Sequence, residues 1–313
     1  MDTAAVACFE ASRHRLAALA YRLLGSAADA EDAVQDAFLR WQAADRERVE
    51  VPEAWLTTIV TNLSLDRLRS AKTRHERSVG AWMPEPLLDG DPMLGPADTV
   101  EQRESVTLAV LTFMEQLSPM ERAVYVLREA FAYSHGEIAE ILGITESGSQ
   151  QHLHRARRRI TAARNDTYDD RASARRIAAA FVEAASSGRT ERLVALLTDD
   201  ATGISDGAGF GRIGKMIRFP TPERIARAMR AGFKPTPAKR RLAGGSPSIH
   251  AAVVNGCPAV LVWLDDRVAG VVILEMRGGK IAGVRGIAAQ ERLGRLTEQW
   301  RRREHDPALI DSW

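Results

Sequence analysis

The chain has 313 residues, a length that allows two or three domains with a core each. Its hydrophobic content of 45% and its charged content of 27% are those of an ordinary globular protein. A net charge of only +2 excludes nucleic-acid binding through global charge, so any such affinity has to come from local clusters.

Two further classes of protein are excluded by the same survey. Cys8 and Cys257 are the only cysteines, and two isolated thiols exclude a cysteine-based zinc site. No apolar run approaches the ~18 residues of a membrane span, and the N-terminus carries Asp2 and Glu10 instead of the basic start of a signal peptide. We therefore expect a cytoplasmic protein with no membrane partner, no metal and no cofactor.

The first part of the chain, residues 6–75, is predicted to form consecutive helices. Gly25 ends the first helix, and the hydroxyl of Ser26 can cap the second. The first turns of that second helix hold the acids Asp29, Glu31, Asp32 and Asp36. The helix macrodipole favours acids at this end, which alone could account for them. Beside the apolar side chains of Val34, Phe38, Leu39 and Trp41, they could instead form a mixed acidic and apolar docking face.

A third helix is predicted after Pro52. Its buried side is marked by Trp55, Ile59, Leu63 and Leu65. Its opposite side gathers the polar and basic residues Asn62, Asp66, Arg67, Arg69, Lys72 and Arg74. A polar and basic face next to aromatic side chains can hold single-stranded nucleic acid by phosphate contacts and base capture. The alternative is an ordinary amphipathic helix with a solvated face.

Residues 76–107 are expected to form an extended, proline-rich linker, because prolines and glycines recur there and exclude a long helix. Its centre places apolar side chains around a stiff Pro-Glu-Pro, whereas a plain spacer would be more polar. We therefore predict that this centre docks on another part of the protein as a regulatory linker. The residues assigned to it are Trp82, Pro84, Glu85, Pro86 and Leu87.

Residues 108–164 contain the strongest local signal, a predicted helix-turn-helix over 133–160. Gly143 separates its two helices, and Thr145 can cap the second. Leu153, Ala156 and Ile160 recur at helical spacing and are expected to face inward. The outward face then carries Ser147, Gln151, His154, Arg155 and Arg158. Such a basic helix can enter the major groove of DNA; the alternative is a helical hairpin with a solvated basic face.

The second half changes in composition after Asn165. An amphipathic helix with an interruption near Gly188 is predicted over 177–197, and the dipeptides Asn255-Gly256 and Gly278-Gly279 indicate two-residue hairpins. They predict an antiparallel meander of four strands: 248–254, 257–264, 267–277 and 280–287. Helices and a curved sheet give an α+β domain over 172–300, followed by a tail over 301–313.

Catalysis in this second half would need acid or base side chains that converge on a pocket. The candidates are Asp199, Asp200, Asp206, His250 and Glu275. Of these, Asp199 and Asp200 are expected at a corner between a helix and a strand, where turns favour aspartate in any case. No two of the candidates form a recognisable pair, so we expect no catalytic residues.

Two stretches of the first half resemble a known family. DAEDAVQDAFLRW (29–41) followed by WLTTIVTNLSLDRLRS (55–70) resembles the second sigma domain of bacterial extracytoplasmic-function (ECF) sigma factors, and residues 117–160 resemble their fourth. The resemblance implies that Asp29, Asp32, Gln35 and Asp36 dock on core RNA polymerase. It also implies that the helix with Asn62, Asp66 and Arg69 opens and reads the −10 promoter element, with Arg67 on the same face. The 146–160 helix would read the −35 element of promoter DNA.

The linker and the second half resemble one subgroup of this family, which carries a fused SnoaL-like cone domain. Trp82 to Leu87 is similar to its Trp-Leu-Pro-Glu-Pro-Leu motif, and Ser205 to Gly209 resembles its Asp-Gly-Gly-Gly-Lys element. The chain departs from the family at Ala208, Phe210 and 289–293. It also departs in the recognition helix, at Gly148, Ser149, Gln150 and His152.

Together these patterns predict a multidomain protein with two all-α sigma domains, 6–75 and 108–164, followed by a SnoaL-like α+β cone domain. It would direct core RNA polymerase to specific promoters. Its C-terminal domain would be regulatory, and a small molecule in the cone is a candidate ligand. One alternative is a helix-turn-helix regulator that senses a small molecule and does not enter the polymerase. Another is an enzyme whose cone domain is catalytic.

Overall fold

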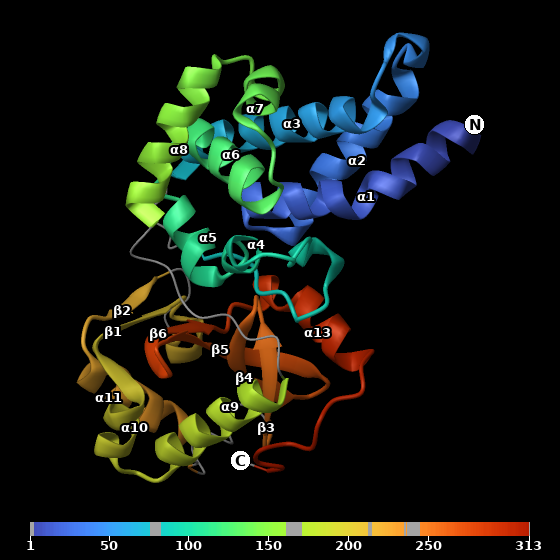
Figure 1. Ribbon diagram of the computed structural model, residues 1–313. Helices are drawn as coiled ribbons and strands as arrows, with labels where there is room; N and C mark the ends of the chain where they lie inside the picture. Colours follow the sequence, from blue (N-terminus) through green and yellow to red (C-terminus); the bar gives the residue numbers. More distant parts are fainter. Residues whose placement is uncertain are drawn as a thin grey trace. The chain divides into compact units, whose positions relative to one another are not determined.

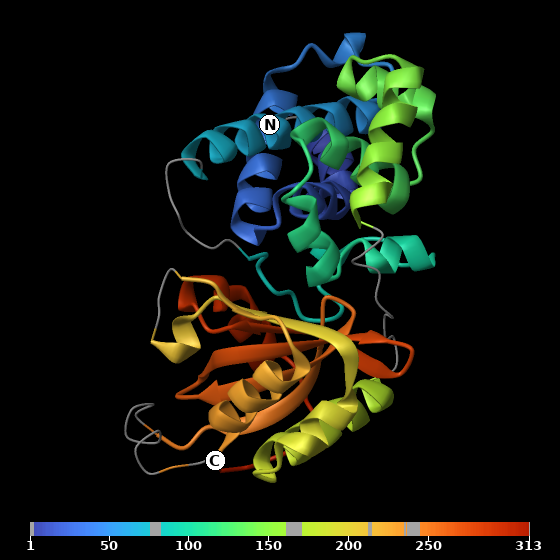
Figure 2. The ribbon, with the colours of Figure 1, turned by 90° about the vertical axis from the view of Figure 1, so that its left-hand side faces the viewer.

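The structure is a computed structural model that describes residues 3–75, 83–160, 171–211, 215–234, 236 and 245–312. The chain divides into two compact units (Figures 1 and 2). The N-terminal unit contains residues 1–79 and 90–164, and the C-terminal unit contains residues 80–89 and 165–313. The chain therefore passes through the C-terminal unit once, over 80–89, before it returns to complete the N-terminal unit.

The N-terminal unit is all-helical. Its helices are α1 (Thr3–Leu24), α2 (Ala27–Ala43), α3 (Pro52–His75), α4 (Val100–Glu104), α5 (Leu108–Met114), α6 (Pro119–Tyr125), α7 (His135–Leu142) and α8 (Glu146–Ile160). A π-helical turn, Val126–Ala130, continues α6. The first three helices pack together, and α8 packs on α6 and α7 (Figure 1).

Local caps explain where several of these helices begin and end. Gly25 adopts a left-handed φ of 69° after α1, and the hydroxyl of Ser26 accepts the Asp29 N–H at the start of α2. The predicted boundaries at these residues are confirmed. Thr99 and Gln102 form a capping box, which explains why α4 is helical within the segment that we expected to be extended up to residue 107.

A fully buried arginine joins the segment before α5 to α1. Arg22 donates to the Ser105 hydroxyl (3.0 Å) and to the carbonyls of Pro96 (3.3 Å) and Gln102 (3.5 Å). Burial lowers the pKa of Arg22 to about 9, so the side chain stays charged at neutral pH. Gly95 passes so close that an added Cβ would lie 2.5 Å from the guanidinium, and its φ of +67° also requires glycine.

The C-terminal unit is an α+β domain built on one sheet. Its elements are α9 (Arg171–Ser186), α10 (Thr190–Leu196), β1 (Leu197–Ser205), β2 (Ile217–Phe219), α11 (Pro222–Phe233), β3 (Ser248–Val254), β4 (Cys257–Leu264), β5 (Arg267–Arg277), β6 (Lys280–Ile287) and α13 (Gly294–Arg301). Among the described residues the strands are ordered β2-β1-β6-β5-β4-β3. The core lies between this sheet and α9, α10 and α11 (Figure 2).

The four strands of the meander begin and end where the hairpin dipeptides predict. Asn255 and Gly256 both adopt a positive φ (50° and 71°), as a two-residue turn requires. The sheet is nevertheless mixed, because β1 pairs with β6 in parallel, and the sequence did not predict β1 or β2. The helix predicted over 177–197 is interrupted near Gly188 as expected, because that residue adopts a φ of 77° between α9 and α10.

Candidate nucleic-acid interface

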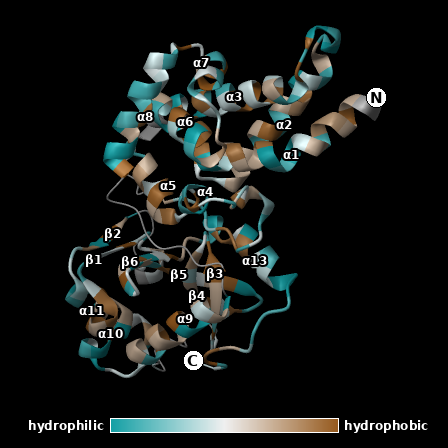
Figure 3. Ribbon diagram, viewed as in Figure 1, coloured by the Kyte–Doolittle hydropathy of each residue, from teal (hydrophilic) through white to brown (hydrophobic). Residues whose placement is uncertain are grey.

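The second helix of the helix-turn-helix, α8, starts as the sequence predicts. Gly143 has a left-handed conformation after α7, and the Thr145 hydroxyl accepts the Gly148 N–H (3.0 Å). Leu153, Ala156 and Ile160 are buried. The ribbon of α8 is coloured largely hydrophilic (Figure 3). All five predicted −35 residues are exposed: Ser147, Gln151, His154, Arg155 and Arg158.

Three of the arginines on α8 are tied back to acids of the same unit. Arg155 and Arg159 lie 3.0 and 2.9 Å from the two carboxylate oxygens of Glu121, and Arg157 lies 2.7 Å from Glu129. These bonds and those from Ser118 outweigh the burial of Glu121 and hold its pKa below the usual value. Arg158 has no ion pair to the described residues. It is therefore the arginine most available to a phosphate.

The departures from the family in α8 have a local explanation. Ser149 is fully buried, and its hydroxyl lies 2.9 Å from Nδ1 of His135 on α7. A polar pair thus replaces an apolar contact between the two helices. An added Cβ at Gly148 would lie 3.1 Å from the Thr145 hydroxyl, so the glycine leaves room for the cap. Sequence reasoning missed His135, Glu121 and Glu129, because their partners lie on other helices.

On α3 the structure brings three of the four predicted −10 residues to one exposed face. Asn62, Asp66 and Arg69 are exposed and are spaced by four and three residues, which places them along one side of the helix. Asp66 and Arg69 form an ion pair of 3.1 Å. Asn62 has no hydrogen-bond partner in the described part of the chain, so its amide is available to a base or a phosphate.

Arg67, the fourth predicted −10 residue, lies elsewhere. Its guanidinium is 2.7 Å from Asp36 and 3.7 Å from Asp32, and it donates to the Asp29 carbonyl (3.2 Å). It therefore joins α3 to the acidic helix α2. Asp29, Asp32 and Gln35 are exposed, and Asp36 is half-buried.

The apolar part of the predicted docking face on α2 needs a correction. Trp41 is only 3% exposed, packs against Trp55 with the two rings tilted by 51°, and donates its indole N–H to the Ala5 carbonyl (2.9 Å). Phe38 packs on Phe9 at a ring-centre distance of 4.8 Å. Both rings thus serve the core of the helices. The apolar residue that α2 does expose is Leu39, which is 54% exposed.

The centre of the linker forms part of the C-terminal unit. Leu87 is fully buried, its N–H donates to the side chain of Asn255 (2.8 Å), and the Asn255 N–H donates to its carbonyl (2.9 Å). Leu88 pairs with Val254 as an isolated bridge at the edge of β3. Met83, Pro84 and Pro86 are also buried, and Glu85 is half-buried. Trp82 lies outside the described residues.

A buried carboxylate organises the loop that follows β1. Both oxygens of Asp206 accept backbone N–H groups, from Ala208 (3.1 Å) and from Ala288 and Ala289 (2.8 Å each). Arg292 lies near this carboxylate. Burial lowers the pKa of Arg292, while the carboxylates of Asp206, Glu291 and Glu85 act to raise it. The linker carboxylate of Glu85 therefore lies near the loop that Asp206 fixes.

The candidate catalytic residues do not converge. Asp206 is occupied by backbone donors, Glu275 forms a buried ion pair with Arg285, and Asp200 pairs with Arg277 at the surface. His250 contacts the Ser248 hydroxyl (2.8 Å), and Asp199 is exposed. Within the described residues no cluster of histidine, cysteine and acidic side chains can hold a metal ion. No described helix is long and apolar enough to cross a membrane.

Comparisons with known proteins match the two helical regions that contain α3 and α8. The models of Sigma-70 region 2 and Sigma-70 region 4 match residues 8–74 and 107–160. The chain is 34% identical over 289 residues to the probable ECF RNA polymerase sigma factor SigI of Mycobacterium tuberculosis, which covers 89% of this chain and 91% of the relative. The chain belongs to the ECF sigma factor family. Such proteins bind core RNA polymerase and promoter DNA to initiate transcription, and they are not enzymes.

A second relative extends the comparison to three dimensions. The chain is 39% identical to the ECF sigma factor SigJ of M. tuberculosis over 202 residues, which is 64% of each protein. The crystal structure of SigJ matches with a TM-score of 0.66 and 28% identity, and it covers 92% of this chain and 97% of that one. The likeness thus includes the additional C-terminal α+β unit.

Proposed function

We propose that this ECF sigma factor binds the polymerase through α2 and promoter DNA through α3 and α8, and that its C-terminal unit regulates it. On α2 the exposed acidic face consists of Asp29, Asp32, Gln35 and Asp36. On α3 the −10 contacts are Asn62, Asp66 and Arg69. Arg67 instead holds the acidic face in place through its contacts with Asp29, Asp32 and Asp36. On α8 the −35 contacts are Ser147, Gln151, His154, Arg155 and Arg158. Their exposure supports these assignments.

The −35 contacts differ in how freely each can reach DNA. Arg158 has no partner in the described chain, so it can neutralise a phosphate without breaking an existing bond. Arg155 has to leave Glu121, which lies 3.0 Å away, or to share its guanidinium between that carboxylate and the DNA. Gln151 and Ser147 are uncharged, and they suit contacts to base edges.

The C-terminal unit is, in this proposal, a SnoaL-like domain that acts on the segment between regions 2 and 4. The observation that carries the proposal is the attachment of residues 83–89 to the β3–β4 hairpin. Two backbone bonds, of Asn255 with Leu87 and of Asp89 with Val253, have lengths of 2.9 Å each. The side chain of Leu87 adds the burial of an apolar residue, which contributes about 2 kcal/mol.

Such an attachment can influence promoter binding because regions 2 and 4 contact each other in the N-terminal unit. Arg15 of α1 donates to the Tyr133 hydroxyl (2.8 Å), and Thr57 of α3 lies 3.2 Å from the same oxygen. The −10 and −35 elements are separate stretches of DNA, so the two regions have to part in order to reach both. The connecting segment between them then has to move or to be released.

The experiment that tests this proposal removes one side chain of the attachment. Asn255→Gly keeps the left-handed turn, which has a φ of 50°, but deletes the acceptor of the buried Leu87 N–H. We expect run-off transcription with core RNA polymerase to change about fivefold, because an unpaired buried donor costs about 1–3 kcal/mol. An increase would mark the attachment as a restraint, and a decrease as a support of the promoter-bound state.

Asp265→Gly is the matched control. Asp265 is an exposed residue with a φ of 49° in the β4–β5 turn of the same sheet, and it has no part in the attachment. If Asn255→Gly and Asp265→Gly transcribe alike from the same promoter, the C-terminal unit does not regulate through residues 83–89.

A further inference from the structure

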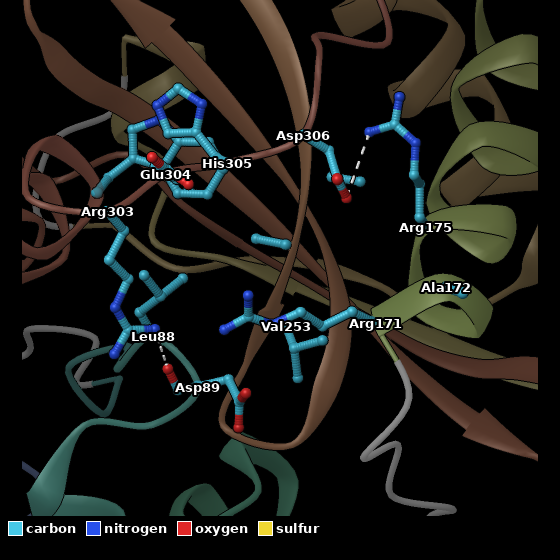
Figure 4. Close-up of a pocket in the computed structure, with 13 residues that line it drawn as sticks. Leu88, Asp89, Arg171, Ala172, Arg175, Val253, Arg303, Glu304, His305 and Asp306 are labelled. Atoms are coloured by element: carbon cyan, nitrogen blue, oxygen red, sulfur yellow. Dashed lines mark hydrogen bonds and ion pairs between the residues drawn. The ribbon is translucent and has the colours of Figure 1, made fainter.

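A cavity of about 650 Å³ lies within the C-terminal unit, at the free edge of β3 (Figure 4). Its walls are the start of α9, the segment that follows α13, and residues 88 and 89 at the end of the linker. Ligand sites for small molecules have volumes of about 300–1,000 Å³. The cavity is therefore large enough for a whole small molecule rather than for an ion or a water.

The floor of the cavity is apolar. Leu88, Val253 and Trp300 are buried residues of its lining. The indole N–H of Trp300, a residue only 4% exposed, is buried without an acceptor in the described part of the chain. This N–H has no accessible surface, so the contribution of Trp300 to the lining is apolar.

The edge of β3 offers a further donor and acceptor. Ile249 bonds to the tail at Ile310 (2.8 Å), and the Val253 carbonyl accepts the Asp89 N–H (2.9 Å). Alternate residues of a strand direct their backbone groups to the same neighbour. Ala251 therefore directs its N–H and carbonyl into the gap between the tail and the linker, where no described segment bonds to them.

Of the three arginines that line the cavity, Arg171 alone has no partner among the described residues. Arg303 donates to the Asp89 carbonyl, and Arg175 donates to the Pro307 carbonyl (2.9 Å) and lies 3.9 Å from Asp306. Arg171 has no hydrogen bond or ion pair to any described residue. Its side chain reaches from the start of α9 toward Leu88 across the cavity (Figure 4). The acids Asp89 and Glu304 also line the cavity, so a cationic ligand is the competing possibility.

We propose that this cavity binds a small amphipathic carboxylate, that is, an acid with an apolar body of about ten carbons. The carboxylate pairs with the guanidinium of Arg171, whose planar donors match its two oxygens. The apolar body lies on Leu88, Val253 and the indole of Trp300. The binding does not depend on the regulatory role proposed above, and its test measures binding alone.

The first arm of the experiment uses the full-length protein and the fluorescent probe 1-anilinonaphthalene-8-sulfonate, which joins an aromatic body to an anion. We expect saturable binding that Arg171→Glu weakens about tenfold or more, because a charge-assisted contact becomes a repulsion. Arg176→Glu is the matched control, since Arg176 lies on the same helix, is exposed and does not line the cavity. Ala172→Trp, which fills the mouth at an exposed position, should also abolish binding.

The second arm distinguishes the chemistry of the ligand with three molecules of equal chain length. Decanoate should displace the probe, whereas decanol and decyltrimethylammonium should do so at least tenfold less effectively. The proposal is overturned if the wild type binds no probe, or if both cavity variants bind it as Arg176→Glu does. It is equally overturned if decyltrimethylammonium competes better than decanoate, because the acids of the lining would then select the ligand.

Discussion

The two units hold distant segments of the chain together by different means. In the N-terminal unit the long-range contacts are made by arginine side chains, from Arg22 to residues 96–105 and from Arg157 to Glu129. In the C-terminal unit backbone pairing adds to such side-chain contacts, at Leu88 with Val254 and at Ile310 with Ile249. Side-chain contacts can be exchanged for contacts to polymerase or DNA, while strand bridges keep a framework in place. Under the function proposed above, the helical unit is therefore the one expected to rearrange.

The largest expected effect comes from removing Arg22, which tests whether arginine contacts hold the N-terminal unit together. Arg22→Ala leaves the Pro96 and Gln102 carbonyls without their donor and opens a cavity among α1 and the segment before α5. We expect a loss of about 3–4 kcal/mol in the free energy of unfolding, measured by urea denaturation. Arg13→Ala is the control on the same helix, because Arg13 is exposed and pairs only with Glu10, a contact worth at most about 0.5 kcal/mol.

Equal stabilities of the two variants would mean that Arg22 is not what holds the segment. The signal should be a shift of the unfolding midpoint of the full-length protein. The stability of the C-terminal unit should be unaffected. The rate at which its buried Cys257 thiol is labelled measures this. Burial raises the pKa of Cys257, so this thiol should react only when its unit opens, in both variants alike.

Arg157 and Arg158 of α8 allow a direct comparison, because Arg157 forms an ion pair with Glu129 and Arg158 forms none with any described residue. Arg157→Ala leaves the buried carboxylate of Glu129 without its partner and should cost about 2 kcal/mol of stability. Arg158→Ala removes no described contact and should leave stability unchanged. It should instead weaken binding to −35 duplex DNA on all sequences and reduce the salt dependence by about one phosphate contact. Fluorescence anisotropy at several salt concentrations measures this, and an unaltered slope for Arg158→Ala would remove it from the interface.

The sequence predicted best what depends on neighbours in the chain. Gly143 and Thr145 define the turn and the start of α8, and Asn255-Gly256 defines the hairpin, because a turn conformation is a property of a few adjacent residues. The additional role of Asn255 could not be predicted, since the partner of its side chain, Leu87, lies 168 residues away. For the same reason the sequence did not predict that Arg22 of α1 is buried.

Two errors show how the tertiary fold overrides a local pattern. Trp41 follows a run of acids and looked like part of a docking face, but Ala5 and Trp55 cover it within the helical core. Asp199 and Asp200 were expected at a corner between a helix and a strand, yet they lie inside β1. The strand pairs with β6 in parallel on either side of these two residues, with an irregularity between Leu197 and Thr202, and no adjacent turn signals such a partner.

The smallest expected effect concerns the contact between regions 2 and 4. Tyr133→Phe deletes the hydroxyl that meets Arg15 and Thr57 but keeps the ring, which lies 5.2 Å from the Arg15 guanidinium. We expect the arrangement in which regions 2 and 4 touch to lose about 1 kcal/mol of stability. If the regions separate on promoter DNA, the separated form has no such contact to lose. The affinity for a promoter should then rise by up to about fivefold. Thr58→Val is the control, because that hydroxyl bonds only within α3, to the Ala54 carbonyl (2.9 Å). A variant Tyr133→Phe that binds promoter DNA no better than Thr58→Val would show that the contact persists on DNA. The arginine contacts of the helical unit would then be as permanent as the strand bridges of the other.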